Sequence, residues 1–101
     1  MKYKIVIDPG HGGEDPGTSG NGIIEKDINL KISLEMYNIL KQLGIPVFIT
    51  RTEDETLNSA QRTKKILEAF GNDPNVIVIS NHVNAGGEDY PCCNQITFFE
   101  T

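Results

Sequence analysis

The sequence contains no tryptophan and only two cysteines, Cys92 and Cys93, which are adjacent. Neighbouring cysteines rarely bridge to each other, because a disulfide needs Cα atoms about 4.4–6.8 Å apart with suitable Cβ directions. The pair also lacks the C-x-x-C spacing of a zinc ribbon or a thioredoxin-like site. We therefore expect two free thiols in a loop of a protein kept in a reducing compartment.

Long apolar runs are also missing. No stretch approaches the roughly 20 apolar residues of a membrane-spanning helix, and the start of the chain, MKYKIVID, has too short an apolar stretch for a signal peptide. Basic residues are few: nine Lys and Arg oppose 14 Asp and Glu, giving a formal net charge of −5. Nucleic acids and anionic membranes are therefore poor partners, because both attract clustered Lys and Arg.

What the sequence does contain is an alternation of strand-like and helix-like segments. The 101 residues suit one small domain. We expect strands at residues 3–8, 47–50, 76–80 and 95–100, helices at 25–43 and from 58 or 59 to 70, and irregular loops at 9–22 and 85–94. This order predicts an α/β fold over residues 1–101, with a mainly parallel twisted sheet of about four strands between helices, in three layers.

Each expected helix has an apolar stripe that we expect to face the sheet. In the first helix the stripe consists of Ile28, Ile32, Ile39 and Leu43, with Met36 and Leu40 beside it. In the second helix it consists of Ala60, Ile66, Leu67 and Phe70.

Three polar side chains follow the first three strands. His11 lies three residues after the first strand, Arg51 directly follows the second, and His82 lies two residues after the third. In open α/β sheets, ligands bind beyond the carboxyl ends of the strands. We therefore expect these residues to gather at one edge of the sheet.

His11, Glu25 and His82 form a candidate metal site. Two imidazoles, a carboxylate and an open position match catalytic zinc chemistry. Taken singly, each residue has a structural reading: a hydrogen-bonded loop histidine, a carboxylate that complements a helix dipole, or a histidine satisfied at a strand end. Together they are more informative, because the chain has only two histidines. The glycine-rich loop has neither a G-x-G-x-x-G between strand and helix nor a P-loop ending, so nucleotide binding is not favoured.

Five blocks in order, IDPGHGGEDPG, IIEKDINLKIS, FITR, AQRTKKILEA and ISNHVNA, resemble the zinc-dependent N-acetylmuramoyl-L-alanine amidases, the amidase-3 family. The resemblance implies one Zn²⁺ bound by His11, Glu25 and His82. It further implies hydrolysis of the amide between N-acetylmuramic acid and L-alanine in peptidoglycan, with the cell wall as the site of action. We expect a monomer.

Other residues near these blocks have two readings each. Asp8 either orients His11 or caps the turn after the first strand. Arg51 either contacts the ligand or pairs with an acidic loop residue, whereas Arg62 is expected to be an ion-pairing scaffold residue. Asn84 either shapes the loop after His82 or touches the substrate.

The general base is the weakest part of the resemblance. The family domain is usually longer than this chain, and its catalytic glutamate lies on a late strand. Glu100 ends the last expected strand and is the available candidate, although its position corresponds to an earlier strand of the family. The resemblance thus makes residues 1–101 the N-terminal portion of a single amidase-like catalytic domain. Two functions stay open: a zinc amidase, or a catalytically inactive zinc-binding or cell-wall-binding module on the same scaffold.

Overall fold

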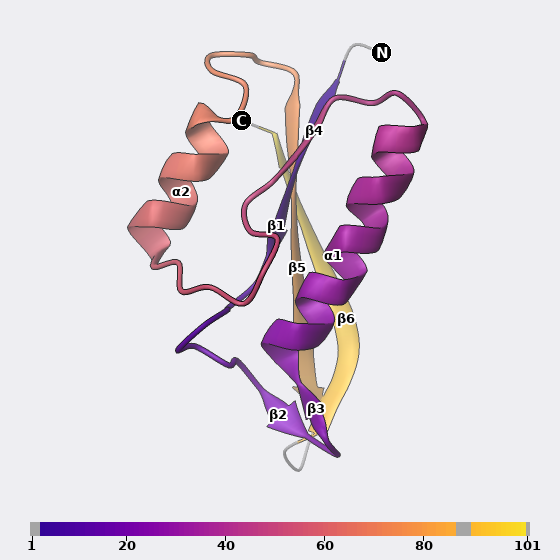
Figure 1. Ribbon diagram of the computed structural model, residues 1–101, viewed down its shortest axis with the longest axis vertical. Helices are drawn as coiled ribbons and strands as arrows, with labels where there is room; N and C mark the ends of the chain where they lie inside the picture. Colours follow the sequence, from indigo (N-terminus) through magenta and orange to yellow (C-terminus); the bar gives the residue numbers. More distant parts are fainter. Residues whose placement is uncertain (1–2, 87–89, 101) are drawn as a thin grey trace.

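A computed structural model describes the backbone of residues 3–86 and 90–100 and the side chains of residues 3–83. Figure 1 shows the main sheet nearly edge-on, with the two helices on opposite sides of it. The elements are β1 (Lys4–Pro9), β2 (Ser19–Gly20), β3 (Ile23–Ile24), α1 (Glu25–Gln42), β4 (Val47–Ile49), α2 (Ser59–Glu68), β5 (Val76–Gly86) and β6 (Tyr90–Glu100). The predicted α/β architecture is confirmed.

The main sheet has the strand order β4-β1-β5-β6. β1 pairs in parallel with both β4 and β5, so that Ile7 lies beside Ile49 on one side and Ile79 on the other. β6 runs antiparallel to β5. Since the three parallel strands share one direction, their carboxyl ends meet at a single edge, the lower end of the molecule in Figure 1.

One face of the sheet packs on α2. Val6, Val76 and Val78 form a buried cluster, and Ile66 and Phe70 pack against it. These valines alternate with residues of the opposite face, as the period of two in a strand requires. The predicted apolar stripe of α2 is thus correct for two of its members, whereas Leu67 is 59% exposed and Ala60 is also exposed.

The face of α1 that is buried is polar. Its fully covered residues are Glu25, Asn29 and Ser33, and the Asn81 side chain of β5 donates to the Asn29 carbonyl and to Ser33 Oγ. The prediction that the isoleucine stripe faces the sheet is wrong for Ile39 and Leu43, which are 56% and 68% exposed. Apolar periodicity defines a stripe, but the hydrogen bonds of the buried polar residues set the rotation of this helix.

Two loop predictions also need correction. The segment 9–22 contains β2, which pairs with β3 across a tight turn at Asn21 and Gly22. Both turn residues have positive φ, 52° and 77°, as a two-residue type I′ hairpin requires. The expected loop at 85–94 is mostly strand, because β5 continues to Gly86 and β6 starts at Tyr90. Cross-strand pairing there overrides a composition typical of turns, with an irregularity in the register at Asn84 and Ala85.

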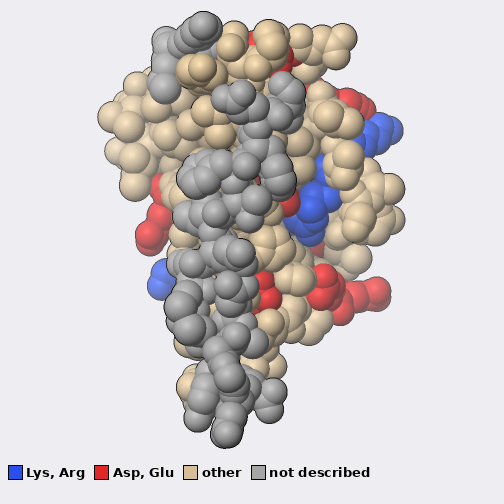
Figure 2. Space-filling view, turned by 180° about the vertical axis from the view of Figure 1, so that it is seen from behind, with Lys and Arg blue, Asp and Glu red and all other residues tan. Residues whose placement is uncertain are grey.

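Among the residues that the structure describes, no helix has the length and apolarity needed to cross a membrane. Figure 2 shows basic and acidic side chains lying next to each other along one edge of the face it presents. The recorded ion pairs agree with such mixing: Lys26 Nζ lies 2.9 Å from Asp54, and Lys65 Nζ lies 3.9 Å from Glu55. The charges of these two pairs are therefore compensated locally.

Candidate metal centre

His11, Glu25 and His82 converge at the carboxyl edge of the sheet. Glu25 Oε2 lies 3.1 Å from His11 Nε2 and 3.3 Å from His82 Nδ1. One ligand atom from each of the three residues lies within 4.8 Å of the others. The two rings meet edge to face, with centroids 5.1 Å apart. Side chains from the loop after β1, the first residue of α1 and β5 therefore surround one point.

Glu25 is the anchor of this group, and its side chain is almost fully buried. Oε1 accepts the Thr18 N–H, and Oε2 accepts the Val83 N–H and the Asn29 amide. Burial raises the pKa of Glu25, but these three hydrogen bonds outweigh it, so the net pKa is below the ordinary value. The carboxylate is therefore held ionised and ready to bind a cation.

The start of α1 is attached to the loop that carries His11. The helix lacks a side-chain cap, and the Thr18 and Pro16 carbonyls accept the N–H groups of Glu25 and Lys26 instead. These bonds satisfy two of the N–H groups that a helix start leaves without partners. The carboxylate ligand is thus fixed relative to the glycine-rich loop.

His11 has a left-handed backbone conformation, with φ of 62°. Such angles are uncommon outside glycine and are often found at functional sites. Its Nδ1 lies 2.7 Å from Asp15 Oδ2. Because an ionised carboxylate only accepts, Nδ1 is the donor, and Nε2 keeps its lone pair toward Glu25 when the ring is neutral. A carboxylate that orients a metal-binding imidazole in this way is typical of zinc sites.

Two glycines let the histidine rings reach this point. A Cβ added to Gly10 would lie 2.5 Å from His82 Cε1, and one added to Gly17 would lie 2.6 Å from Glu25 Oε1 and 2.7 Å from His11 Cδ2. All three distances are far below a normal contact. The glycine-rich loop therefore serves close packing around the two rings and the carboxylate.

The donor set fits zinc. Tetrahedral zinc with bonds of about 2.0–2.2 Å places its ligand atoms about 3.3–3.6 Å apart. Glu25 Oε2 lies 3.3 Å from His82 Nδ1, at the lower end of that range, and 3.1 Å from His11 Nε2, slightly below it. When both rings are neutral, the lone pair of His11 Nε2 faces a carboxylate oxygen, an arrangement that a cation between the atoms would stabilise.

Asp8 occupies a different cluster from the one expected. Its Oδ1 accepts from Thr50 Oγ1 at 2.9 Å and from Arg62 Nη1 at 2.6 Å, and its Oδ2 accepts from Ser80 Oγ at 3.2 Å. The carboxylate that contacts His11 is Asp15. The expectation for Arg62 is confirmed, because it forms an ion pair with Asp8.

Arg51 is 2% exposed and binds backbone carbonyls. Its guanidinium donates to the carbonyls of Gly10 at 2.9 Å, Lys26 at 3.0 Å and Glu53 at 3.1 Å. The expected pairing with an acidic side chain of the loop is replaced by a bond to the Glu53 backbone. Arg51 lies beside the candidate metal centre, where it holds the backbone next to two of the candidate ligands.

Sequence reasoning did not identify Asp15 and Asn29 as part of the site. Asn29 is fully buried and donates both to Glu25 Oε2 at 3.2 Å and to the Gly10 carbonyl at 3.1 Å. Its position four residues after Glu25 places both on one helix face, a signal that could have identified it. Asp15 lies in an irregular loop, where no periodicity indicates which way a side chain points.

Two predicted residues, Asn84 and Glu100, have side chains outside the described residues. Their backbones belong to β5 and β6. Glu100 pairs with Ile77, five positions before His82 in β5. At about 3.3 Å per residue this is roughly 16 Å along the strand. The backbone register therefore separates Glu100 from the candidate metal ligand of the same sheet.

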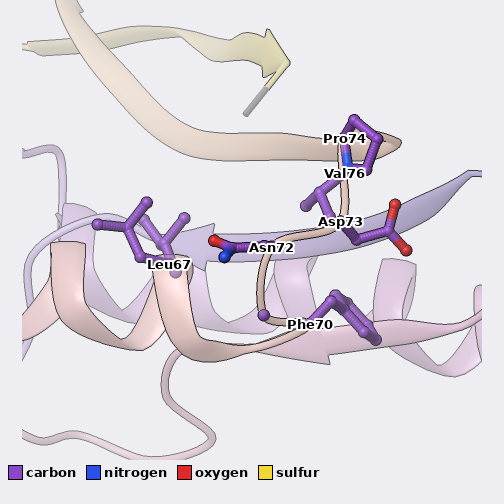
Figure 3. Close-up of a pocket in the computed structure, with 8 residues that line it drawn as sticks. Leu67, Phe70, Asn72, Asp73, Pro74 and Val76 are labelled. Atoms are coloured by element: carbon purple, nitrogen blue, oxygen red, sulfur yellow. The ribbon is translucent and has the colours of Figure 1, made fainter.

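A pocket of about 360 Å³ lies at the opposite end of the sheet (Figure 3). It is formed by the end of α2, the turn after it and the first residue of β5, Val76. Asp73, at its rim, forms an ion pair with Lys4. The pocket is separated from the metal centre by the length of β5, so it does not form part of that site.

Comparison with known proteins identifies the family. Residues 5–96 match the family described as N-acetylmuramoyl-L-alanine amidase. The chain belongs to this family. It is 42% identical to the N-acetylmuramoyl-L-alanine amidase CwlM of Bacillus licheniformis over 93 residues, which are 86% of this chain and 35% of that protein. It is also 42% identical to the sporulation-specific amidase of Bacillus subtilis over 86 residues, 83% of this chain and 32% of the relative.

Solved amidase structures share the fold. The amidase AmiC2 of Nostoc punctiforme superposes with a TM-score of 0.73 at 32% identity, covering 87% of this chain and 47% of that structure. The catalytic domain of CwlV from Paenibacillus polymyxa gives 0.73 at 36% identity, covering 85% and 48%. The chain thus spans about a third of these curated relatives and about half of the solved domains.

Proposed function

We propose that this chain forms the zinc centre of an N-acetylmuramoyl-L-alanine amidase, which hydrolyses the amide between the lactyl group of N-acetylmuramic acid and L-alanine in peptidoglycan. The substrate is then the bacterial cell wall. The observation that carries the proposal is the approach of His11 Nε2 and His82 Nδ1 to one oxygen of Glu25, at 3.1 and 3.3 Å.

Each residue of the site has a separate task in this proposal. A bound zinc ion would polarise the amide carbonyl and lower the pKa of its water toward neutrality. His11, Glu25 and His82 hold that ion. Asp15 keeps the Nδ1 proton of His11 in place, so that Nε2 offers its lone pair. The hydrogen bonds to Glu25 fix the carboxylate before the ion arrives.

A second function is favoured by one observation. Both carboxylates that contact the imidazoles within residues 3–83, Asp15 and Glu25, are engaged in holding those rings. Neither is free to move a proton to the leaving amine. Loss of a general base typically lowers a rate by about 10²–10⁴-fold. A zinc-binding or wall-binding module with little turnover is therefore the alternative.

Two measurements test the proposal in sequence. Metal content after zinc loading and dialysis should give one equivalent per chain, and incubation with purified muropeptide should release the amino group of L-alanine only in the presence of zinc. Zinc binding and muropeptide binding without release would select the module. A wild-type chain that retains no zinc would contradict both functions.

The matched variant is His82→Ala, with Asn72→Ala as its control. His82→Ala should lose stoichiometric zinc, since two ligands hold the ion far less tightly than three. Asn72 lies in the turn at the opposite end of the sheet, so its replacement should leave the zinc content unchanged. Full zinc retention by the His82 variant would contradict the assignment of the ligands.

A further inference from the structure

We infer that Arg51 and Arg62 are positioning residues for the metal centre: they fix the backbone segments that carry His11 and Glu25 without contacting the ion. This inference rests on the proposed zinc site. It concerns three consecutive carbonyl groups, those of Pro9, Gly10 and His11, each of which accepts a hydrogen bond from one of the two guanidinium groups.

Arg62 holds the outer two carbonyls. From α2, its Nη1 donates to the Pro9 carbonyl at 2.7 Å, and its Nη2 donates to the His11 carbonyl at 3.0 Å. The guanidinium is itself held by Asp8 Oδ1 at 2.6 Å. One planar group thus binds the chain on both sides of Gly10.

Arg51 holds the central carbonyl and joins it to the helix. Its Nη2 donates to the Gly10 carbonyl at 2.9 Å and to the Lys26 carbonyl at 3.0 Å. Gly10 directly precedes His11, and Lys26 directly follows Glu25. The same nitrogen therefore connects the backbone of one ligand to the backbone of another, and Asn29 adds a second donor to the Gly10 carbonyl.

The conformation of His11 explains why so many bonds are needed. A residue with a Cβ adopts a φ of 62° only where its surroundings hold it there. The two planar guanidinium groups of Arg51 and Arg62, which bind the carbonyls of residues 9–11, supply that restraint. Lysine cannot replace them, because its ammonium is a single point donor on a flexible stem, whereas guanidinium presents several donors in fixed directions.

A general role in stability is the competing explanation, and the chain offers a control for it. Lys65 lies on α2 like Arg62, and its Nζ donates to the Thr50 carbonyl at 2.8 Å. Lys65 is therefore also a cation that donates to a backbone carbonyl at the end of a strand. It touches neither the segment of residues 9–11 nor the start of α1 in the recorded contacts of residues 3–83.

The test compares Arg51→Lys, Arg62→Lys and Lys65→Met with the wild type. Zinc dissociation constants come from competition with a chromophoric chelator, and the melting temperature of each metal-free protein gives its stability. We expect both arginine variants to bind zinc about 10- to 100-fold more weakly, the range found when groups supporting metal ligands are removed. Lys65→Met should lower the melting temperature and leave the zinc dissociation constant unchanged.

A metal-free measurement separates this inference from the proposed function. The backbone amide signals of residues 10–12 in ¹H–¹⁵N NMR spectra of the metal-free protein report the conformation of this segment, which the bonds from Arg62 restrain. In Arg62→Lys these signals should shift, because the planar group that holds the Pro9 and His11 carbonyls is lost, whereas Lys65→Met should leave them in place. Because lysine keeps the positive charge of arginine, the change reports lost geometry and not lost charge.

The outcomes are distinct. If the wild type binds zinc and both arginine variants bind it equally well, the inference is wrong and the proposed function stands. If the wild type binds no zinc but these amide signals change as expected, the proposed function fails, and only the structural part of the inference stands, that Arg62 holds the segment of residues 9–11. Unchanged amide signals in Arg62→Lys overturn the positioning role in either case. Should Arg51→Lys fail to fold, Arg62→Lys decides alone, since the Arg62 side chain is 16% exposed and is the less buried of the two.

Discussion

Glycine and histidine meet at the candidate metal centre, where an added Cβ would collide with a ring. Gly10 has an ordinary φ, so its lack of a side chain is used for space alone, against the His82 ring. Gly17 has a φ of 70° and is needed both for conformation and for space. Gly10 is therefore the cleaner position at which to test the close packing.

Gly10→Ala should push the His82 ring away from Glu25, because its Cβ would lie 2.5 Å from Cε1. Overpacking of this kind costs about 1–3 kcal/mol, so zinc affinity should fall by about 5- to 160-fold. Isothermal titration with zinc measures it. Gly44→Ala is the control: its φ is 76° and no atom lies within 4 Å of the added Cβ, so stability should fall while zinc binding does not. Equal affinities in Gly10→Ala and wild type would show that the ring has room to move.

Asp15 is the second residue whose replacement is informative. Asp15→Ala removes the acceptor of the His11 Nδ1 proton, and zinc affinity should fall by about 10- to 100-fold. Glu14→Ala removes an exposed carboxylate one position away and serves as the control. A fall of the same size in both variants would indicate a general loss of negative charge instead of a lost hydrogen bond.

At the scale of elements, the two helices start in different ways. α1 starts without a side-chain cap, and loop carbonyls take the place of one. α2 starts with a capping box, in which Asn58 accepts the Gln61 N–H at 2.8 Å and the Gln61 side chain accepts the Asn58 N–H at 2.9 Å. The sequence could reveal the second start, because the box is local. It could not reveal the first, because the partners come from the loop of residues 16–18.

Asn58→Ala should lower the free energy of unfolding by about 1 kcal/mol, the usual cost of losing such a cap. Urea unfolding at neutral pH, followed by far-UV circular dichroism, measures the change. Ser59→Ala alters the next residue, which is not the cap, and should have a much smaller effect. Similar losses in the two variants would mean that the box contributes little to α2.

The apolar stripe of α1 shows that the sequence of a single helix does not predict which of its sides packs on the sheet. The sequence established a long helix from the spacing of its apolar residues. It did not establish which side of that helix contacts the sheet. Asn29 and Ser33 face Asn81 of β5 through hydrogen bonds, and this polar contact leaves Ile39 and Leu43 exposed.

For the whole molecule, acidic residues outnumber basic ones by 14 to 9, and several carboxylates are stabilised by partners. Asp73 has a lowered pKa because Lys4 donates to it and, secondly, because the Asn75 N–H does. A carboxyl whose folded pKa is below its unfolded value stabilises the fold above the unfolded pKa. That contribution is lost as the pH falls through the folded pKa.

Asp73→Asn should therefore be less stable than the wild type at pH 6–7. The difference should shrink as the pH falls below 3.8 and should disappear once the pH is below the lowered pKa of the folded carboxyl. Asparagine retains an acceptor for the Asn75 N–H, so the change removes the contact with Lys4 alone. Melting temperatures measured across this pH range give the result. A difference that persists unchanged in acid would show that the Lys4 ion pair is not its cause.

The order of β1, α1, β4, α2 and β5, and the edge at which His11 and His82 lie, followed from the sequence alone. The reason is that hydrophobic period and glycine position are local, and that parallel strands place their ends together. The sequence also limited the metal-binding nitrogens, because it offers only two histidines. These features required no knowledge of distant contacts.

Only the tertiary structure decided which carboxylate serves which imidazole, which face α1 buries and how far β6 extends. Asp8 and Asp15 are the same residue type at similar distances from His11 in the sequence, yet one pairs with Arg62 and the other with His11. That choice depends on α2 and on the left-handed turn at His11, which bring together groups up to 54 residues apart. Such directions are set by packing and hydrogen bonds between elements, and no local pattern encodes them.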